Sequence, residues 1–284
     1  EMAAAIRTEP EVTDYQVYAG VASPYNFNGL VRHAYLRSDP EQGDLQLNLS
    51  PKSERNRTSH AIALEVRQRL KGLPLPPAGS IKVVEVPPGP PVLATLLAEV
   101  YGPDAETRRE VASRLRALFR QVPFVVDDDD SFGVPAERLR VGIDHNNLEF
   151  HRVEERDVYD TIQTYLSGVV VGYSHKGGGR HPVEIAVQLP KSHLRIGSET
   201  LSTPVPANAL PGARGVVELG DVVTRTRETA SFPVFRHNGR PAEMVLAELA
   251  GQFEAPVYGM LAVEDLIAKA DWGALGRPQV RYHG

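Results

Sequence analysis

The chain has 284 residues, of which 42% are hydrophobic and 24% charged, with a net charge of −5 and no cysteine. These are ordinary values for a globular protein, and the length predicts roughly two compact units. The acidic balance argues against nucleic acid as a partner, because nucleic-acid-binding domains usually carry a basic excess. The lack of cysteine excludes disulfides, thiol catalysis and cysteine-ligated zinc.

The sequence contains no candidate membrane anchor. Its best apolar run, residues 92–101, has about half of the roughly 20 residues that a membrane helix needs, and it contains Glu99. The prolines within 87–91 fix φ and cannot donate ladder hydrogen bonds, so we expect a stiff joint leading into a buried strand. The opening EMAAAIRTEP is no signal peptide and resembles the end of a helix, which suggests a fragment of a longer chain.

The first part of the chain, residues 1–88, is predicted to be a split βαβ unit that lacks its first strand. Residues 1–8 have a helical pattern, and Pro51 suits the first position of a second helix. The buried face of that helix carries apolar residues at helical spacing. The strands are expected at 15–19, 31–36, 45–49 and 81–86, and the buried helical face at Ile62, Val66 and Leu70.

A second unit of the same kind is predicted at 89–132 and 232–284. After the strand at 92–101, Asp104 is expected to cap a helix with one apolar stripe. A short strand at 125–126 is then followed by Asp127–Asp130, which are interpreted as a solvated acidic turn. The stripe consists of Val111, Leu115, Leu118, Phe119 and Val122, and the later elements are strands at 232–237, 242–249 and 279–282 and a helix at 259–270.

Residues 133–231 have a different pattern and are predicted to be a mixed α/β insertion in the second unit. A strand at 139–144 precedes a helix at about 153–168 with Gly168 as its stop. The segments SHKGGGRHP and PANALPGARG each indicate the turn of a hairpin. The predicted fold class is therefore α+β.

Several segments resemble the second large periplasmic loop of resistance–nodulation–division (RND) efflux transporters. These are LNLSPKSERNRTSHAIALEVRQRL, IDHNNLEFHRVEERDVYDTIQTYLSGVVVGY, VVELGDVV and FPVFRHNGRPAEMVLAEL, in this order. The resemblance covers nearly the whole chain. It implies two porter subdomains of split-βαβ (ferredoxin-like) type, at 1–88 and at 89–132 with 232–284, and a docking subdomain at 133–231.

The resemblance also implies a place and partners for the chain. In this family the loop lies at the periplasmic face of the bacterial inner membrane, within a homotrimeric, proton-driven pump. Its partners are the membrane helices and the first periplasmic loop of the same transporter, a periplasmic adaptor and an outer-membrane channel. The proton-relay residues lie in membrane helices outside this chain, so no catalytic residue and no cofactor is expected. The isolated chain is expected to be a monomer or a weak oligomer.

The segment GVASPYNFNG at 20–29 is the main candidate for binding cargo. One interpretation is an ordinary turn whose aromatic side chains fold onto the core. By resemblance it instead corresponds to the switch loop that divides the substrate pockets of the first porter subdomain. Aromatic rings give large apolar contacts with few rotors, which suits varied cargo. The candidate residues are Tyr25, Asn26, Phe27 and Asn28.

The two predicted hairpin turns are the candidate docking loops. By resemblance, the first turn faces the adaptor or the channel through Lys176, Arg180 and His181. The second, from Asn208 to Arg214, corresponds to the loop that docks beside it.

Other motifs fail at required positions. An EF-hand counted from Asp127 needs Gly and Glu where Phe132 and Arg138 stand. The glycines of GYSHKGGGRHP are not followed by Lys-Ser/Thr. There is no HExxH or GxSxG, and the three methionines are too few for a soft-metal cluster. A free-standing α/β ligand-binding module, and a metal-dependent enzyme using the His and Asp loops, remain the alternative hypotheses.

Overall fold

The computed structural model describes residues 1–284 except 77–78, 87–91, 177–178, 211–212, 252, 254, 276–277, 279 and 284. The proline joint predicted at 87–91 therefore lies outside the described residues. The chain divides into two compact units, Glu1–Pro135 with Ser231–Gly284 (unit 1) and Ala136–Ala230 (unit 2). Helices and small antiparallel sheets occur together, which confirms the α+β class.

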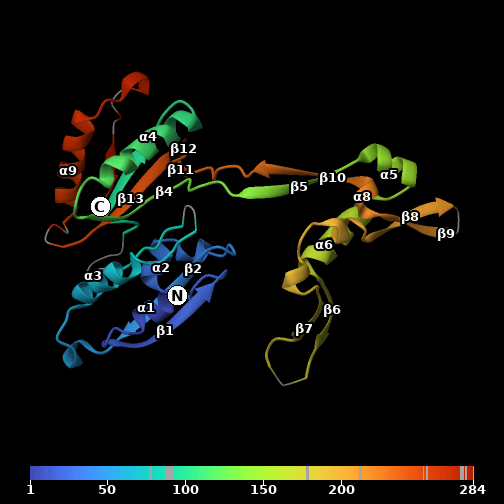
Figure 1. The fold of residues 1–284 in the computed structure, drawn as a ribbon, viewed down its shortest axis with the longest axis horizontal. Coiled ribbons are helices and arrows are strands. Elements are labelled where there is room, and N and C mark those ends of the chain that lie inside the picture. The colour runs from blue at the N-terminus through green and yellow to red at the C-terminus, as the bar shows by residue number, and fades with distance from the viewer. Residues whose placement is uncertain are drawn as a thin grey trace. The chain divides into compact units, whose positions relative to one another are not determined.

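The first half of unit 1, residues 1–86, contains a two-stranded sheet packed against two helices (Figure 1). The longer helix begins after Thr58, whose hydroxyl accepts the N–H of Ala61 at 3.1 Å. Its buried face is the predicted one, and it packs against Ile6. The elements are α1 (Met2–Ile6), β1 (Val12–Ala19), β2 (Gly43–Leu49) and α3 (Ser59–Leu70).

Three predictions for this half are wrong. The strand expected at 31–36 is replaced by the helix α2 (Phe27–Val31) and a 3-10 turn (Ala34–Leu36). The Asn26 side chain accepts the N–H of Gly29 at 2.7 Å and so starts α2, which outweighs the strand propensity of the residues that follow. The second helix begins at residue 59 instead of 51, after a separate 3-10 turn. Residues 81–86, all of them described, form no strand.

The second half of unit 1 is a four-stranded antiparallel sheet in the order β14-β3-β13-β4. Two β–α–β motifs, β3-α4-β4 and β13-α9-β14, interleave in this sheet, which is the ferredoxin-like arrangement. Helices α4 and α9 pack against the sheet and enclose the main core (Figure 1). The elements are β3 (Leu96–Val100), α4 (Ala105–Phe119), β4 (Val125–Asp130), β13 (Glu243–Leu249), α9 (Pro256–Lys269) and β14 (Arg281–His283).

Helix α4 forms where the sequence predicts it. The carboxylate of Asp104 accepts the N–H of Thr107 at 2.8 Å, which confirms the cap. The stripe residues Val111, Leu115 and Phe119 are buried in the core. The strand expected at 232–237 is much shorter, because only β11 (Arg236–His237) forms, paired with β12 (Arg240–Pro241).

The prediction of a solvated acidic turn at Asp127–Asp130 is also wrong. All four residues belong to β4, which pairs with β13 from Leu249 to Val245. The pairing shifts register beside Asp127, whose φ of 54° is left-handed. A run of carboxylates forms a strand here because cations bind it on both sides, as described below.

Unit 2 has a core of its own. The core gathers residues from helices, from β8 and from the start of β10. Both predicted hairpins are confirmed, whereas α5 was not predicted. The elements are β5 (Glu137–Ile143), α5 (His145–His151), α6 (Glu155–Ser167), β6 (Val169–Ser174), β7 (Val183–Val187), α7 (Ser198–Leu201), β8 (Pro204–Leu210), β9 (Ala213–Glu218), α8 (Leu219–Val222) and β10 (Val223–Thr229).

The β6–β7 hairpin is unusual because its apolar side chains face solvent. Three of its valine side chains are exposed by more than half, Val171 at 60%, Val183 at 61% and Val187 at 58%. The two strands form a sheet of their own, and among the described residues no other strand pairs with either outer edge.

We expect that Leu115→Ala will destabilise unit 1. Leu115 is fully buried under the sheet, and such a truncation removes transfer free energy and leaves a cavity, which together cost about 2–5 kcal/mol. Urea unfolding followed by circular dichroism measures the loss. Leu36→Ala, at an exposed side chain, is the control and should change the unfolding free energy by less than about 0.5 kcal/mol. Equal effects of the two substitutions would contradict this core assignment.

Candidate functional site

The predicted cargo segment places its aromatic side chains in solvent. Tyr25 is 80% exposed and Phe27 is 70% exposed, so neither ring folds onto the core as the ordinary-turn interpretation requires. Tyr35 lies near Tyr25, with ring centroids 6.1 Å apart. Exposed aromatic side chains on one short segment offer an apolar surface to a ligand. Their role in binding cargo stays a prediction.

The aromatic segment is attached to the second half of unit 1 by an ion pair. Arg32, the residue that ends α2, contacts Glu248 of β13 through Nη1 and Oε1 at 2.5 Å. The other oxygen of Glu248 accepts a hydrogen bond from the hydroxyl of Thr95. A loop of the first half is thus bound to the central sheet of the second half.

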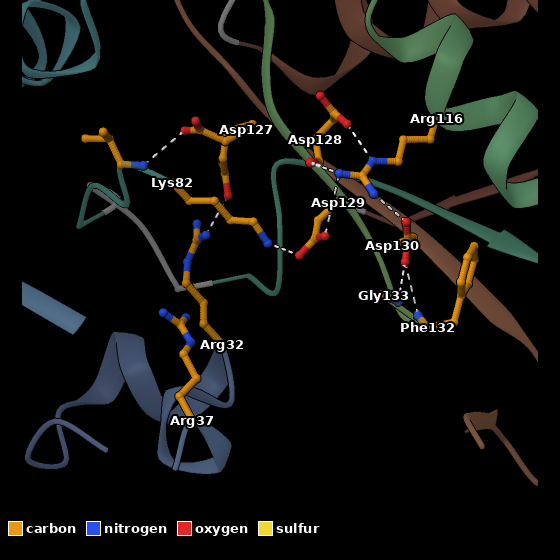
Figure 2. Close-up of polar contacts among 12 residues, drawn as sticks. Arg32, Arg37, Lys82, Arg116, Asp127, Asp128, Asp129, Asp130, Phe132 and Gly133 are labelled. Carbon is orange, nitrogen blue, oxygen red and sulfur yellow. Dashed lines mark hydrogen bonds and ion pairs between the residues drawn. The ribbon is translucent and has the colours of Figure 1, made fainter. Parts of the chain in front are cut away.

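One arginine of the neighbouring helix, Arg116, makes close contacts with two aspartates of β4 and a longer one, of 3.9 Å, with Asp129. The guanidinium of Arg116 on α4 contacts Asp128 at 2.6 Å and Asp130 at 2.5 Å, and it reaches between them in Figure 2. Asp130 also accepts the N–H groups of Phe132 and Gly133. These contacts neutralise one side of the acidic strand within the second half.

The other two aspartates of β4 bind the first half. Asp127 contacts Nε of Arg67 on α3 at 3.0 Å and accepts the backbone N–H of Val83 at 3.3 Å. Asp129 binds the ammonium group of Lys82, as Figure 2 shows. Among the described residues, the ion pairs of Arg67, Lys82 and Arg32 thus form three polar links between the halves of unit 1.

Two titratable groups of these links, Lys82 and Asp127, are partly buried, and burial shifts the pKa of each. Burial, together with the nearby charges of Arg37 and Arg116, lowers the pKa of Lys82 from 10.5 to about 8, despite the attraction of Asp127 and Asp130. Burial also raises the pKa of the Asp127 carboxyl, against the opposing effect of Arg67. Sequence reasoning missed the links, because their partners are 47 to 216 residues apart.

The candidate docking residues lie on two separate hairpins. Lys176, Arg180 and His181 are exposed near the tip of β6–β7. Asn208 is on β8 and donates its backbone N–H to the carbonyl of Arg152 at 3.0 Å. The side chain of Arg214, on β9, lies outside the described part. Figure 1 shows the two hairpins leaving unit 2 in different directions.

The described residues contain neither a metal-binding cluster nor a membrane-spanning helix. No group of three or more His, Cys, Asp or Glu side chains there could hold a metal ion. Within the same residues, none of the helices combines the length and the apolar composition needed to cross a bilayer.

Comparison with known proteins identifies the family. The sequence profile of the AcrB/AcrD/AcrF family matches residues 2–257, which is most of the chain. The chain belongs to this family. The predicted resemblance to RND efflux transporters is confirmed, and the family is one of transporters and not of enzymes. No curated protein sequence matches the chain.

Solved RND structures share the fold. Two X-ray crystal structures of a heavy metal efflux pump, crystal forms I and II, match with TM-scores of 0.68 and 0.70 and sequence identities of 19% and 18%. Each match covers 100% of this chain and 28% of the pump chain. The chain therefore spans a little over a quarter of those pumps, with the fold of their periplasmic porter-type domains.

We expect Lys82 to make stability increase with pH in mildly alkaline solution. Its pKa is about 8 in the folded protein and 10.5 in the unfolded chain, so the unfolded chain binds more protons above pH 8. The free energy of unfolding should then rise with pH in that range. Urea unfolding of the Lys82→Met protein at pH about 7.5 and about 9.5 should show a weaker rise than wild type.

The matched control for this experiment is Lys269→Met. Lys269 is exposed on α9 and pairs with Asp265 one turn away. Its substitution should leave the alkaline rise unchanged. A full rise in the Lys82→Met protein would show that another group is responsible.

Proposed function

We propose that the chain is the periplasmic portion of a proton-driven RND efflux pump, which binds cargo between two porter subdomains. The porter subdomains are residues 1–88, and residues 89–132 with 232–284. The observation that carries the proposal, beyond family membership, is the pair of exposed rings of Tyr25 and Phe27 on a segment bound to β13 by Arg32. This arrangement supports cargo capture where the two subdomains meet.

The contacts between the subdomains suit a clamp that opens and closes. The three polar links join side chains of the first half to the sheet edge and strand β13 of the second half. Ion pairs gain little net free energy when partly buried, because desolvation offsets the attraction. Water can replace them when the subdomains separate, which favours rigid-body shear over deformation of either core.

The remaining parts of the proposal follow the family. Residues 133–231 would dock to an outer-membrane channel and a periplasmic adaptor, through the tips of the two hairpins. The full transporter would be a homotrimer in the inner membrane, and proton flow through its membrane helices would supply the energy. The chain itself would carry cargo without catalysing a reaction.

Soft monovalent metal ions, such as those of copper and silver, are not the cargo that we propose. The structural neighbours export heavy metals, but the three methionines here stand on separate elements. Met2 is on α1, Met244 on β13 and Met260 on α9. Soft-metal transport would need thioether ligands that converge on one point.

Replacing Phe27 should impair export by the full transporter. Phe27→Ala, combined with Tyr25→Ala, removes most of the exposed aromatic surface of the segment. Loss of such contacts should weaken cargo binding about tenfold or more, since a fully buried aromatic side chain contributes roughly 1.5–3 kcal/mol. Efflux of an amphipathic fluorescent dye from cells measures the effect. Leu36→Ala is the control, and normal efflux by the double variant at equal expression would exclude the segment as a cargo site.

Reversing charge at the β6–β7 tip should weaken docking. Lys176 and Arg180 are exposed there, and rim charges mainly set association rate and salt dependence. Lys176→Glu with Arg180→Glu should therefore reduce cross-linking of the pump to its adaptor or channel in cells. Lys269→Glu, in unit 1, is the matched control. Unchanged cross-linking by the tip variant would place the docking surface elsewhere.

A further inference from the structure

The dipeptide Asn-Gly, which is prone to deamidation, occurs twice in the chain, at 28–29 and at 238–239. The reaction begins when the backbone nitrogen of the glycine attacks the side-chain carbonyl carbon of the asparagine. Glycine favours this step because it has no Cβ to hinder the approach. Reaction at either place then depends on whether that nitrogen is free and whether the local backbone can rearrange.

The pair at 28–29 is held by helix α2. The N–H of Gly29 donates to the side chain of Asn26 at 2.7 Å, so the attacking nitrogen is occupied. Oδ1 of Asn28 is buried. Attack at Asn28 therefore requires local opening of α2, which costs free energy.

The pair at 238–239 is the turn between β11 and β12. Both residues are exposed and have left-handed φ, 48° at Asn238 and 75° at Gly239, as a two-residue hairpin turn requires. Among the described residues, no partner binds the N–H of Gly239 or the carboxamide of Asn238. Arg236 donates to the carbonyl of Gly239 at 3.3 Å, and a nearby cation favours the amide anion from which the attack starts.

We propose that Asn238 is a site of spontaneous deamidation from which Asn28 is protected. The amide nitrogen of Gly239 gives its proton to hydroxide and bonds to Cγ of Asn238, and ammonia leaves. Water then opens the succinimide ring at one of its two carbonyl carbons. The products carry aspartate or isoaspartate at position 238, with a new negative charge and no change of oxidation state.

The isoaspartate product would loosen the hairpin from the sheet. Its backbone runs through the former side chain and gains a methylene group, so the two-residue turn no longer fits. The intact turn places Nδ1 of His237 at 3.0 Å from the buried carboxylate of Glu99. It also places the guanidinium of Arg240 over the ring of Tyr101, at 4.5 Å. A modification at the exposed turn thus acts on contacts with strand β3 and the residue that follows it.

The test incubates the 284-residue chain in mildly alkaline buffer, with and without urea, and follows both Asn-Gly peptides by mass spectrometry. In the folded protein Asn238 should deamidate at least about tenfold faster than Asn28, because reaction at Asn28 waits for α2 to open. In urea the two rates should become similar, since neither pair is then held. Gly239→Ala, in urea, should slow the reaction at Asn238 and leave that at Asn28 unchanged.

Hydrogen exchange measures the loosening of the hairpin. The N–H of buried Ala242 donates to the carbonyl of Phe235 at 3.2 Å, next to the paired strands. Its protection should fall in the isoaspartate form, isolated by chromatography. The matched control is Asn238→Asp, which has the same charge and a normal backbone and should keep the protection.

Each part of the inference has an outcome that overturns it. Equal rates at the two sites in the folded protein, or a faster reaction at Asn28, overturn the modification site. A difference that persists unchanged in urea overturns the protection by α2, and unchanged protection of Ala242 in the isoaspartate form overturns the effect on the hairpin. The proposed function is decided separately, by the efflux of the Tyr25 and Phe27 variants.

Discussion

The four successive aspartates of strand β4 are neutralised by cations from both halves of unit 1. Adjacent carboxylates repel each other, and a strand turns alternate side chains to opposite faces. Asp128 and Asp130 make the short contacts with Arg116 of the same half, which also lies 3.9 Å from Asp129, while Asp127 and Asp129 bind Arg67 and Lys82 of the other half. The acidic run therefore joins the helix α4, the sheet and the first half of unit 1 through one strand.

The nature of this junction is consistent with a part that moves. The links between the halves are ion pairs and hydrogen bonds, whereas the two halves keep separate apolar cores. Buried apolar contact would hold the halves in one arrangement, because each methylene taken from water adds stability. Polar links exchange with water at little net cost, so the halves can separate without disturbing either core.

The sequence predicted the parts of the fold that local signals determine. Asp104 and the stripe through Leu115 predicted helix α4, and the glycine-rich turns predicted both hairpins of unit 2. The strand expected at 31–36 did not form, since Val31 ends helix α2, which starts at the cap of Asn26, and Ala34–Leu36 form a 3-10 turn.

The links of the candidate site depended on tertiary structure and could not be predicted. Glu248 is 216 residues from Arg32, and no local pattern connects them. One signal was present for the acidic strand: Arg116 and Arg120 stand one helical turn apart shortly before it, and both bind Asp128. A charge run that follows a basic helix face should be considered as a paired strand as well as a solvated turn.

The exposed valines of the β6–β7 hairpin have a consequence for biogenesis. A two-stranded ribbon with open edges and uncovered apolar side chains is a template for wrong strand pairing. Val183–Val187 carries one charge, Glu184, and no proline that would deter such pairing. Exposure of this ribbon in the newly made protein therefore favours aggregation, and covering the ribbon would remove that risk.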